Sequence, residues 1–355
     1  MATITKTAVE QVTPVAPKVV TASPHLPRPV DAAGWRDSAV ALDEWISKPI
    51  LQTPSLGWLE YAISLPGSMF GIPLYSLVLL PSVIGAAAEI MAGVPGGCAG
   101  WICAAMVTLW SAFWAVCIAE SVANPPDHEG GIARAFHPLK QGTIVTLAGP
   151  HLTVWLMGQS SSTARSAACF YISIFYVTQL VIEFLKTTSR RLRPVVKVKS
   201  ALVGVTRQIP QIQYFLSREH AMHSSFPSGD ASGSTTFAII GMLVTPSPYR
   251  EMLLPVWAFF PALSTFARIY FHAHFFGDVM LGHALAAAVA YPFVGAAPFE
   301  WTTFTWGGLL ACEIPVIILW AGVQKLKPKS AEAIYNADGL MKPMWLFSGS
   351  KAKAT

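Results

Sequence analysis

Charged residues are scarce in this sequence: they make up 12% of its 355 positions, whereas apolar residues make up 53%. The mean hydropathy is positive, and this composition argues against a soluble globular domain and in favour of a membrane protein. Cysteine is also scarce, and the five cysteines lie scattered through apolar segments without the spacing of metal ligands. We therefore expect small packing residues at these positions rather than a zinc site or disulfides.

Several other signals are missing. The net charge is +5, but no basic run is interleaved with aromatic residues. The positive residues are better explained as flanks of membrane segments, and we expect no nucleic-acid partner. The N-terminus has no apolar core, which argues against a cleaved secretory signal; an organelle-targeting peptide and a disordered tail remain the alternatives for the first 30 residues. There is no internal repeat, which disfavours a transporter.

Long runs with few or no charges predict an all-α, polytopic membrane helical bundle. Crossing a bilayer core takes about 20 apolar residues, so we expect six to eight spans. The candidates are residues 69–92, 98–119, 167–185, 231–244, 253–271, 279–294 and 305–323. Residues 143–158 are shorter and contain Gly149, Pro150 and His151, so a short span and an interfacial segment remain alternatives there. Glu313 lies within an apolar span, where we expect it to pair inside the bundle or to stay protonated.

These spans predict three regions along the chain. Residues 1–60 are expected to be a largely disordered tail, in which the Trp and Leu content of residues 31–51 allows an interfacial amphipathic helix. Residues 61–325 are expected to form the membrane-embedded domain. Residues 326–355 are expected to be a basic tail suited to an anionic membrane surface.

Three short stretches, far apart in the sequence, carry the candidate functional residues. They are Lys186–Pro194 (KTTSRRLRP), Pro227–Asp230 (PSGD) and Ala267–Asp278 (ARIYFHAHFFGD). The first follows a predicted span, the second precedes the next span, and the third follows the span that returns. All three are therefore predicted to meet at one membrane face. Each stretch alone is an ordinary membrane flank or turn, but their order and their shared face indicate one site.

The cations of this face suit a phosphate group. Arg193 and Arg268 offer guanidinium groups with paired donors, and Lys186 adds an ammonium charge. Ser228 and Gly229 stand where a new helix is predicted to begin, and a helix N-terminus is a ready site for an anion. A glycine at this position also lets the backbone approach the phosphate closely. The residues thus predict a phosphate site that uses no metal and no cofactor.

His274 is the candidate nucleophile, because imidazole can form a phosphohistidine that water then hydrolyses. Asp278, four residues later, lies on the same face if the segment is helical. It is expected to hold the ring in its reactive tautomer, as the carboxylate of a serine triad does. Asp230 is the candidate acid that protonates the leaving group, a role that requires it to carry a proton at neutral pH.

In these residues the chain resembles the type 2 phosphatidic acid phosphatase superfamily, integral-membrane lipid phosphate phosphatases related to the vanadium haloperoxidases. The family pattern reads K-x6-R-P, P-S-G-H and S-R-x5-H-x3-D. The sequence matches it at Lys186, Arg193 and Pro194, then at Pro227, Ser228 and Gly229, then at Arg268, His274 and Asp278. It departs at two positions, with Ala267 in place of Ser and Asp230 in place of the His thought to protonate the leaving group.

The resemblance implies hydrolysis of lipid phosphate monoesters or diphosphates by an all-α membrane phosphatase, without a metal or a cofactor. It assigns Lys186, Arg193, Ser228, Gly229 and Arg268 to the phosphate, His274 to nucleophilic attack and Asp278 to its orientation. The implied substrate is phosphatidate, a sphingoid-base phosphate or an isoprenyl diphosphate, held in the bilayer of an endomembrane such as the endoplasmic reticulum or of the plasma membrane. A lipid phosphotransferase and, because of Asp230, an inactive lipid-phosphate-binding scaffold remain alternatives.

Overall fold

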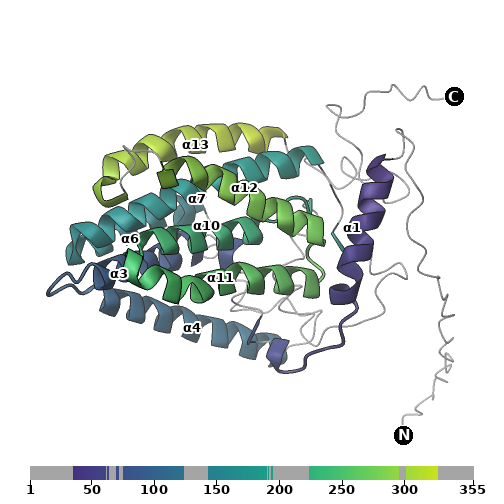
Figure 1. The fold of residues 1–355 in the computed structure, drawn as a ribbon, viewed down its shortest axis with the longest axis horizontal. Helices are drawn as coiled ribbons and strands as arrows, with labels where there is room; N and C mark the ends of the chain where they lie inside the picture. Colours follow the sequence, from purple (N-terminus) through teal and green to yellow (C-terminus); the bar gives the residue numbers. More distant parts are fainter. Residues whose placement is uncertain are drawn as a thin grey trace, which may run out of the picture. The chain divides into compact units, whose positions relative to one another are not determined.

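A computed structural model describes residues 35–60, 62–63, 69–71, 75–123, 143–189, 191, 193–194, 224–295 and 301–326. The regular elements of these residues are all helices, as predicted. They are α1 (Trp35–Leu51), η1 (Met69–Gly71), η2 (Tyr75–Leu79), α3 (Leu80–Met91), α4 (Ala99–Ala123), α6 (Thr143–Ser160), α7 (Ser162–Ser189), α10 (Gly229–Val244), α11 (Ser247–Tyr270), α12 (Phe276–Gly295), η4 (Trp301–Thr303) and α13 (Trp306–Leu326) (Figure 1). The chain divides into two compact units, residues 1–42 and 43–355. In the described residues the first unit holds only the beginning of α1, and the other helices all belong to the second unit.

Among the described residues, four helices, α7, α11, α12 and α13, are long and apolar enough to cross a membrane. Residues Tyr75–Met91 and Ala99–Leu109 form shorter apolar helices. The predicted all-α polytopic bundle is therefore confirmed, while the count of six to eight spans stays a prediction. The segment left open at residues 143–158 is helical, as α6, although it is not one of the four long apolar helices.

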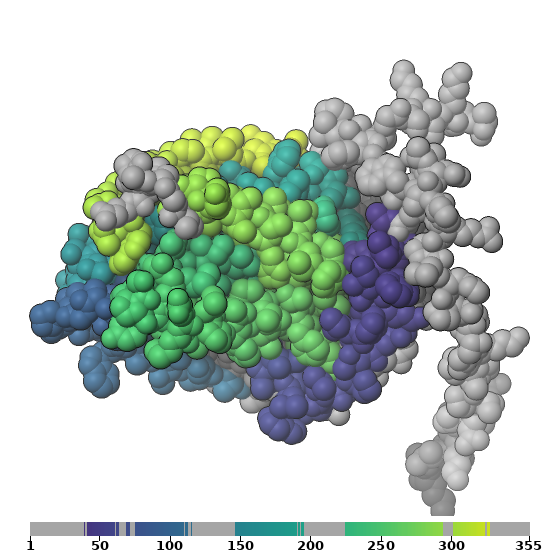
Figure 2. Space-filling view, in the orientation of Figure 1, coloured from purple at the N-terminus to yellow at the C-terminus, as the bar shows by residue number. Residues whose placement is uncertain are grey.

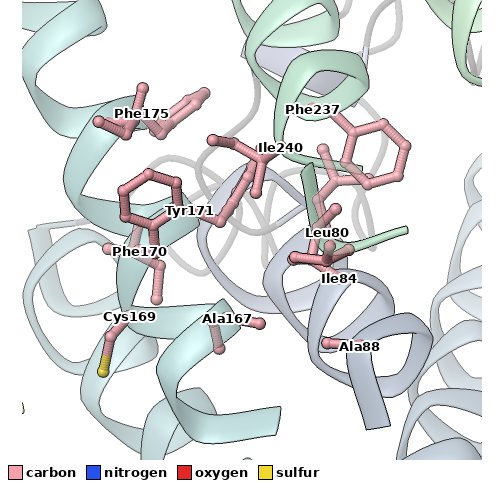
Figure 3. Close-up of a cluster of buried hydrophobic side chains, with 14 of the residues drawn as sticks. Leu80, Ile84, Ala88, Ala167, Cys169, Phe170, Tyr171, Phe175, Phe237 and Ile240 are labelled. Atoms are coloured by element: carbon pink, nitrogen blue, oxygen red, sulfur yellow. The ribbon is translucent and has the colours of Figure 1, made fainter. Parts of the chain in front are cut away.

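Helix α7 occupies the centre of the bundle, where it packs against α3, α6, α10, α12 and α13. The core lies where α7 meets α3 and α10. It is filled by Phe170 and Tyr171 from α7, Phe237 from α10, and Leu80 and Ile84 from α3 (Figure 3). The rings of Tyr171 and Phe237 meet edge to face with their centroids 6.2 Å apart, a favoured aromatic geometry. This packing fixes the end of α7, from which the first motif stretch emerges.

Part of the bundle surface is apolar. Exposed side chains include Met252, Leu254, Val256 and Phe259 on α11, and Ile314, Ile318 and Leu319 on α13. Helices α11 and α13 form much of the green and yellow surface in Figure 2. A soluble monomer rarely exposes so many large apolar groups together, whereas lipid chains solvate them. The surface therefore agrees with the membrane placement that the composition predicts.

One polar cluster lies within the bundle, between α6, α7 and α13. His151 Nε2 is 2.9 Å from Oε2 of Glu313, and the hydroxyl of Tyr176 donates to the same carboxylate at 3.3 Å. The indole of Trp306 donates to Nδ1 of His151 at 3.0 Å. Because indole can only donate, Nδ1 is the acceptor and the ring proton lies on Nε2, facing the carboxylate. The prediction that Glu313 pairs inside the bundle is confirmed.

The N-terminal boundary differs from the expected one. Residues Trp35–Leu51 form α1, and the compact unit begins at Asp43 rather than at residue 61. The reason is tertiary: the segment from Asp43 to Glu60 forms hydrogen bonds with residues at the junction of α11 and α12. These partners hold in place a segment that the sequence assigns to a tail. Residues 1–34 and 327–355 lie outside the described residues, and so do the predictions made for them.

Candidate active site

The three motif stretches lie together at one end of the bundle. Helix α7 ends within the first stretch, α10 begins at the second, and α11 ends within the third. Backbone hydrogen bonds join the stretches. The amide of Ser225 donates to the carbonyl of Arg191 at 2.7 Å, and the amide of Ser228 donates to the carbonyl of Asp278 at 2.9 Å. The prediction that the stretches meet at one face of the molecule is confirmed.

His274 lies in the short connection between α11 and α12 and is 1% exposed. Its amide donates to the carbonyl of Arg268 at 3.1 Å, which ties the residue to the end of α11. Its ring Nδ1 lies 2.6 Å from the carbonyl oxygen of Ser225. A carbonyl oxygen can only accept, so Nδ1 carries the ring proton and Nε2 keeps the lone pair that a nucleophile needs.

The surroundings of His274 favour the neutral ring. Burial lowers the pKa of His274 well below 6.5, and the nearby cations lower it further. In order of effect, these cations are Arg193, Arg268 and Lys186. The imidazole is therefore neutral at physiological pH. The cations that keep it neutral are the same three that the sequence assigns to the phosphate.

Asp278 does not make the direct hydrogen bond to His274 that its spacing predicts. Its Oδ2 lies 3.9 Å from the ring Nδ1, which is too far for a hydrogen bond. The expectation assumed one continuous helix, whereas α11 ends before His274 and α12 begins after it. Oδ2 instead accepts from the amide of Phe275 at 2.8 Å. The carboxylate is also hydrogen-bonded to the hydroxyl of Ser225, the residue whose carbonyl holds the histidine ring.

Arg193 and Arg268 bring two buried positive charges to the site, with 3% and 6% of their surfaces exposed. Burial, followed by the charge of Arg268, lowers the pKa of Arg193 to about 10. Arg193 therefore stays charged at neutral pH, and it is repelled by Arg268 in a region of low dielectric constant. A phosphate dianion between such groups offsets that repulsion and receives paired donors from each.

The start of α10 adds further groups suited to an anion. The hydroxyl of Ser228 caps the helix by accepting from the amide of Ala231 at 3.3 Å, a contact that typically stabilises a helix by about 1 kcal/mol. The same hydroxyl keeps its own proton for donation. A Cβ atom placed on Gly229 would lie 3.3 Å from Nζ of Lys186, so the glycine leaves room for the ammonium group at the helix start. Lys186 also pairs with Glu183 at 3.1 Å.

The sequence profile of the PAP2 superfamily matches residues 167–301, a range that contains all three motif stretches. Residues 167–301 belong to the PAP2 superfamily. The predicted relation to the type 2 phosphatidic acid phosphatases is thereby confirmed, and membership indicates phosphatase-type activity on phosphate esters. Comparison with curated proteins finds no match to the chain, and comparison with solved structures finds none either.

Within the PAP2 domain, Asp230 has contacts that differ from those of a proton donor. Its Oδ1 accepts from the amide of Gly71 at 2.7 Å, and its Oδ2 lies 3.1 Å from Nε of Arg268. One oxygen thus accepts a backbone hydrogen bond, and the other forms an ion pair, without a hydrogen bond from Nε, with a candidate phosphate-binding cation. A general acid instead holds a proton on one oxygen and directs it at the leaving group. The geometry therefore favours a role in holding Arg268 over the proton donation that the sequence predicts.

Arg191, a cation of the PAP2 domain, is not among the candidate site residues that the motifs identify. Nη1 of Arg191 lies 2.8 Å from Oδ1 of Asp278 and 2.5 Å from Oδ2 of Asp43, and its guanidinium carbon is 4.3 Å above the ring of Phe275. Burial opposes its charge, but the carboxylates of Asp278 and Asp43 outweigh burial and raise the pKa of Arg191. Nothing in the sequence marks this residue, because the motif leaves the positions between its lysine and its arginine unspecified.

Proposed function

We propose that the protein is a membrane-embedded phosphatase that hydrolyses lipid phosphate monoesters or diphosphates through a phosphohistidine at His274, without a divalent metal. The observation that carries the proposal is the 2.6 Å contact between the ring Nδ1 and the carbonyl oxygen of Ser225. It leaves the Nε2 lone pair free in a ring that burial and three cations keep neutral. A buried, neutral and oriented imidazole among phosphate-binding cations is suited to attack on phosphorus.

In the proposed first step, Nε2 of His274 attacks phosphorus, a P–N bond forms and the bond from phosphorus to the leaving oxygen breaks. The ring then carries a positive charge, because Nδ1 keeps its proton. The buried carboxylate of Asp278, 3.9 Å from Nδ1, stabilises this imidazolium through space. The leaving oxygen takes up a proton from water or a bound donor. Water next attacks the phosphorus, the P–N bond breaks, and inorganic phosphate leaves the neutral ring.

Lys186, Arg193 and Arg268 are proposed to hold the non-bridging oxygens during both steps. Those oxygens gain charge as phosphorus is attacked, so the cations bind the transition state more tightly than the substrate. Removing such a cation costs on the order of three to five powers of ten in other phosphoryl-transfer sites. Ser228 and the amides at the start of α10 are proposed to complete the cradle.

We assign Asp230 to the positioning of Arg268, through the 3.1 Å ion pair, rather than to proton donation. The amide of Gly71 holds the other oxygen and so fixes the carboxylate. An arginine positioned in this way approaches the phosphate with less loss of side-chain freedom, which lowers the cost of binding.

The lipid nature of the substrate is supported by the location of the site. The motif stretches lie at the ends of α7, α11 and α12, three helices with the length and the apolar character of membrane spans. A phosphate at the end of an apolar chain reaches such a site with its chain still in the bilayer. Phosphatidate, sphingoid-base phosphates and isoprenyl diphosphates share this chemistry.

The proposal is tested by phosphate release from purified protein in detergent micelles with EDTA present, over a panel of these three lipids and a water-soluble phosphate ester. We expect turnover of at least one lipid phosphate and its loss in His274→Ala. Glu251→Gln, which removes an exposed carboxylate near the start of α11, at the end of that helix away from His274, is the matched control. Vanadate binding without turnover of any phosphate would contradict the proposal and favour a binding protein. Transfer of phosphate to an added alcohol, with no release to water, would favour a phosphotransferase.

A further inference from the structure

Asp43, which lies on α1 outside the PAP2 match, contacts two parts of the candidate site at once. Its Oδ1 accepts from the amide of Gly277 at 2.6 Å, in the first turn of α12. Its Oδ2 pairs with Nη1 of Arg191 at 2.5 Å. A Cβ atom on Gly277 would lie 2.7 Å from Oδ2 of Asp43, so the approach of the carboxylate depends on this glycine.

Arg191 also contacts Asp278, the buried carboxylate near His274. The Nη1 atom that meets Asp43 also lies 2.8 Å from Oδ1 of Asp278. The other oxygen of Asp278 accepts from the amide of Phe275, directly after His274. The chain of contacts therefore runs from α1 through the first motif stretch to the connection that carries His274.

Other residues of the same N-terminal segment meet the same connection. The hydroxyl of Ser47 accepts from the amide of Phe276 at 2.8 Å. The carbonyl of Leu51 accepts from the ring of His272 at 3.0 Å. The hydroxyl of Tyr270 donates to Glu60 at 2.5 Å. Residues 43–60 thus hold the residues on both sides of His274, from the end of α11 to the start of α12.

We propose that Asp43 is a positioning residue for the phosphoryl-transfer step, acting through Arg191 on Asp278 and on the placement of the His274 ring. The inference rests on the proposed function of His274. It extends the catalytic unit beyond residues 167–301 to a helix whose sequence carries no phosphatase motif. Asp43 touches none of the candidate phosphate-binding groups, so it is not itself a catalytic residue.

The alternative is that Asp43 simply caps α12, as an acidic group near a helix N-terminus often does. The two roles differ in what the loss of charge does. Asp43→Asn keeps an oxygen that can accept from the Gly277 amide but removes the charge that pairs with Arg191. A capping role predicts a small effect of this substitution, whereas a positioning role predicts a loss in the chemical step.

The test is a double-mutant cycle on the full-length protein in micelles with EDTA, comparing Asp43→Asn, Arg191→Gln and the double variant. A misplacement of about 1 Å can cost on the order of a hundredfold, so we expect Asp43→Asn to lower kcat about tenfold or more. KM and the affinity for vanadate should stay within about twofold, because the phosphate-binding cations are unchanged. The double variant should be no worse than Arg191→Gln alone, because both substitutions break one chain of contacts. Glu251→Gln, which removes an exposed carboxylate at the other end of α11, is the matched control.

Hydrogen–deuterium exchange of peptides covering residues 271–280 gives a readout that does not depend on turnover. Asp43→Asn and Arg191→Gln should both speed exchange at Phe275, while Glu251→Gln should not. If the wild-type protein releases no phosphate, the proposed function fails, and this exchange measurement still decides the linkage. The inference would be overturned if Asp43→Asn kept the wild-type kcat, or if its lower activity were fully explained by a smaller number of protein molecules able to bind vanadate. Additive losses of kcat in the double variant would also overturn it. Unchanged exchange in both variants would do the same.

Discussion

The carbonyl oxygen of Ser225 accepts the Nδ1 proton of His274 at 2.6 Å. Ser225 is linked in turn to the first motif stretch, because its amide donates to the carbonyl of Arg191 at 2.7 Å. A backbone acceptor cannot change its protonation state, so it fixes the ring tautomer at every pH at which the fold persists. The path of the backbone before the second motif therefore decides that Nε2, the nitrogen proposed to react, keeps its lone pair.

Phosphate should be trapped on His274 during turnover. We expect rapid quenching with a labelled substrate to leave an acid-labile, base-stable phosphoryl group, which is the behaviour of a P–N bond. Mass spectrometry should place the group on His274, and His274→Ala should abolish it and lower turnover by at least about a thousandfold. A labelled serine or aspartate in its place would mean that another residue is the nucleophile.

The acid limb of kcat/KM should report the depressed pKa of His274. Activity is lost as pH falls through this pKa, because the protonated ring has no lone pair. Burial and three cations place the pKa well below 6.5, so the wild-type limb should lie below that value. Arg193→Gln removes the strongest of those cations, and the limb should move to higher pH in the residual activity. Arg250→Gln, which removes a positive charge near the start of α11, should leave it in place. An identical limb in all three proteins would show that His274 does not control it.

Leaving groups should separate the two roles considered for Asp230. A proton donor matters for an alkoxide and hardly at all for p-nitrophenolate, which leaves without a proton. If Asp230 holds Arg268, Asp230→Asn should lower kcat/KM for alkyl and for p-nitrophenyl phosphates by a similar factor, about tenfold, because it weakens a charged contact near the phosphate. A loss confined to the alkyl substrate would restore the proton-donor role.

The pair of His151 and Glu313 should matter for stability and not for chemistry. His151→Leu leaves the Glu313 carboxylate inside the bundle without its imidazole partner, which should cost about 2 kcal/mol of unfolding free energy. His151→Leu combined with Glu313→Leu should recover part of the loss, because no unpaired charge then remains. Unfolding midpoints in a mild detergent measure this. Phosphate release per vanadate-binding site should stay unchanged, since Tyr176 of this cluster lies ten residues, or about 15 Å of helix, before Lys186. A matching loss of specific activity would link the cluster to the site.

Sequence reasoning was most successful where local patterns carry the information. Apolar runs predict the helices, because a bilayer requires their length and their composition. The motif spacings identify Lys186, Arg193, Arg268 and His274, and alternating helix direction places them at one end of the bundle. The predicted direct contact between Asp278 and His274 is wrong, because the i+4 rule holds only within one helix and the helix is interrupted between α11 and α12.

The sequence by itself determined the membrane class, the helical fold and the set of phosphate-binding candidates, because each follows from residue type at short spacing. Only the tertiary structure decided how these residues are held. The acceptor from Ser225 is a backbone group, so no residue type marks it. The contact between Asp43 and Gly277 joins positions 234 residues apart, and no local pattern records such a pairing. Both contacts join segments far apart in the sequence, so they exist only once the helices have packed together.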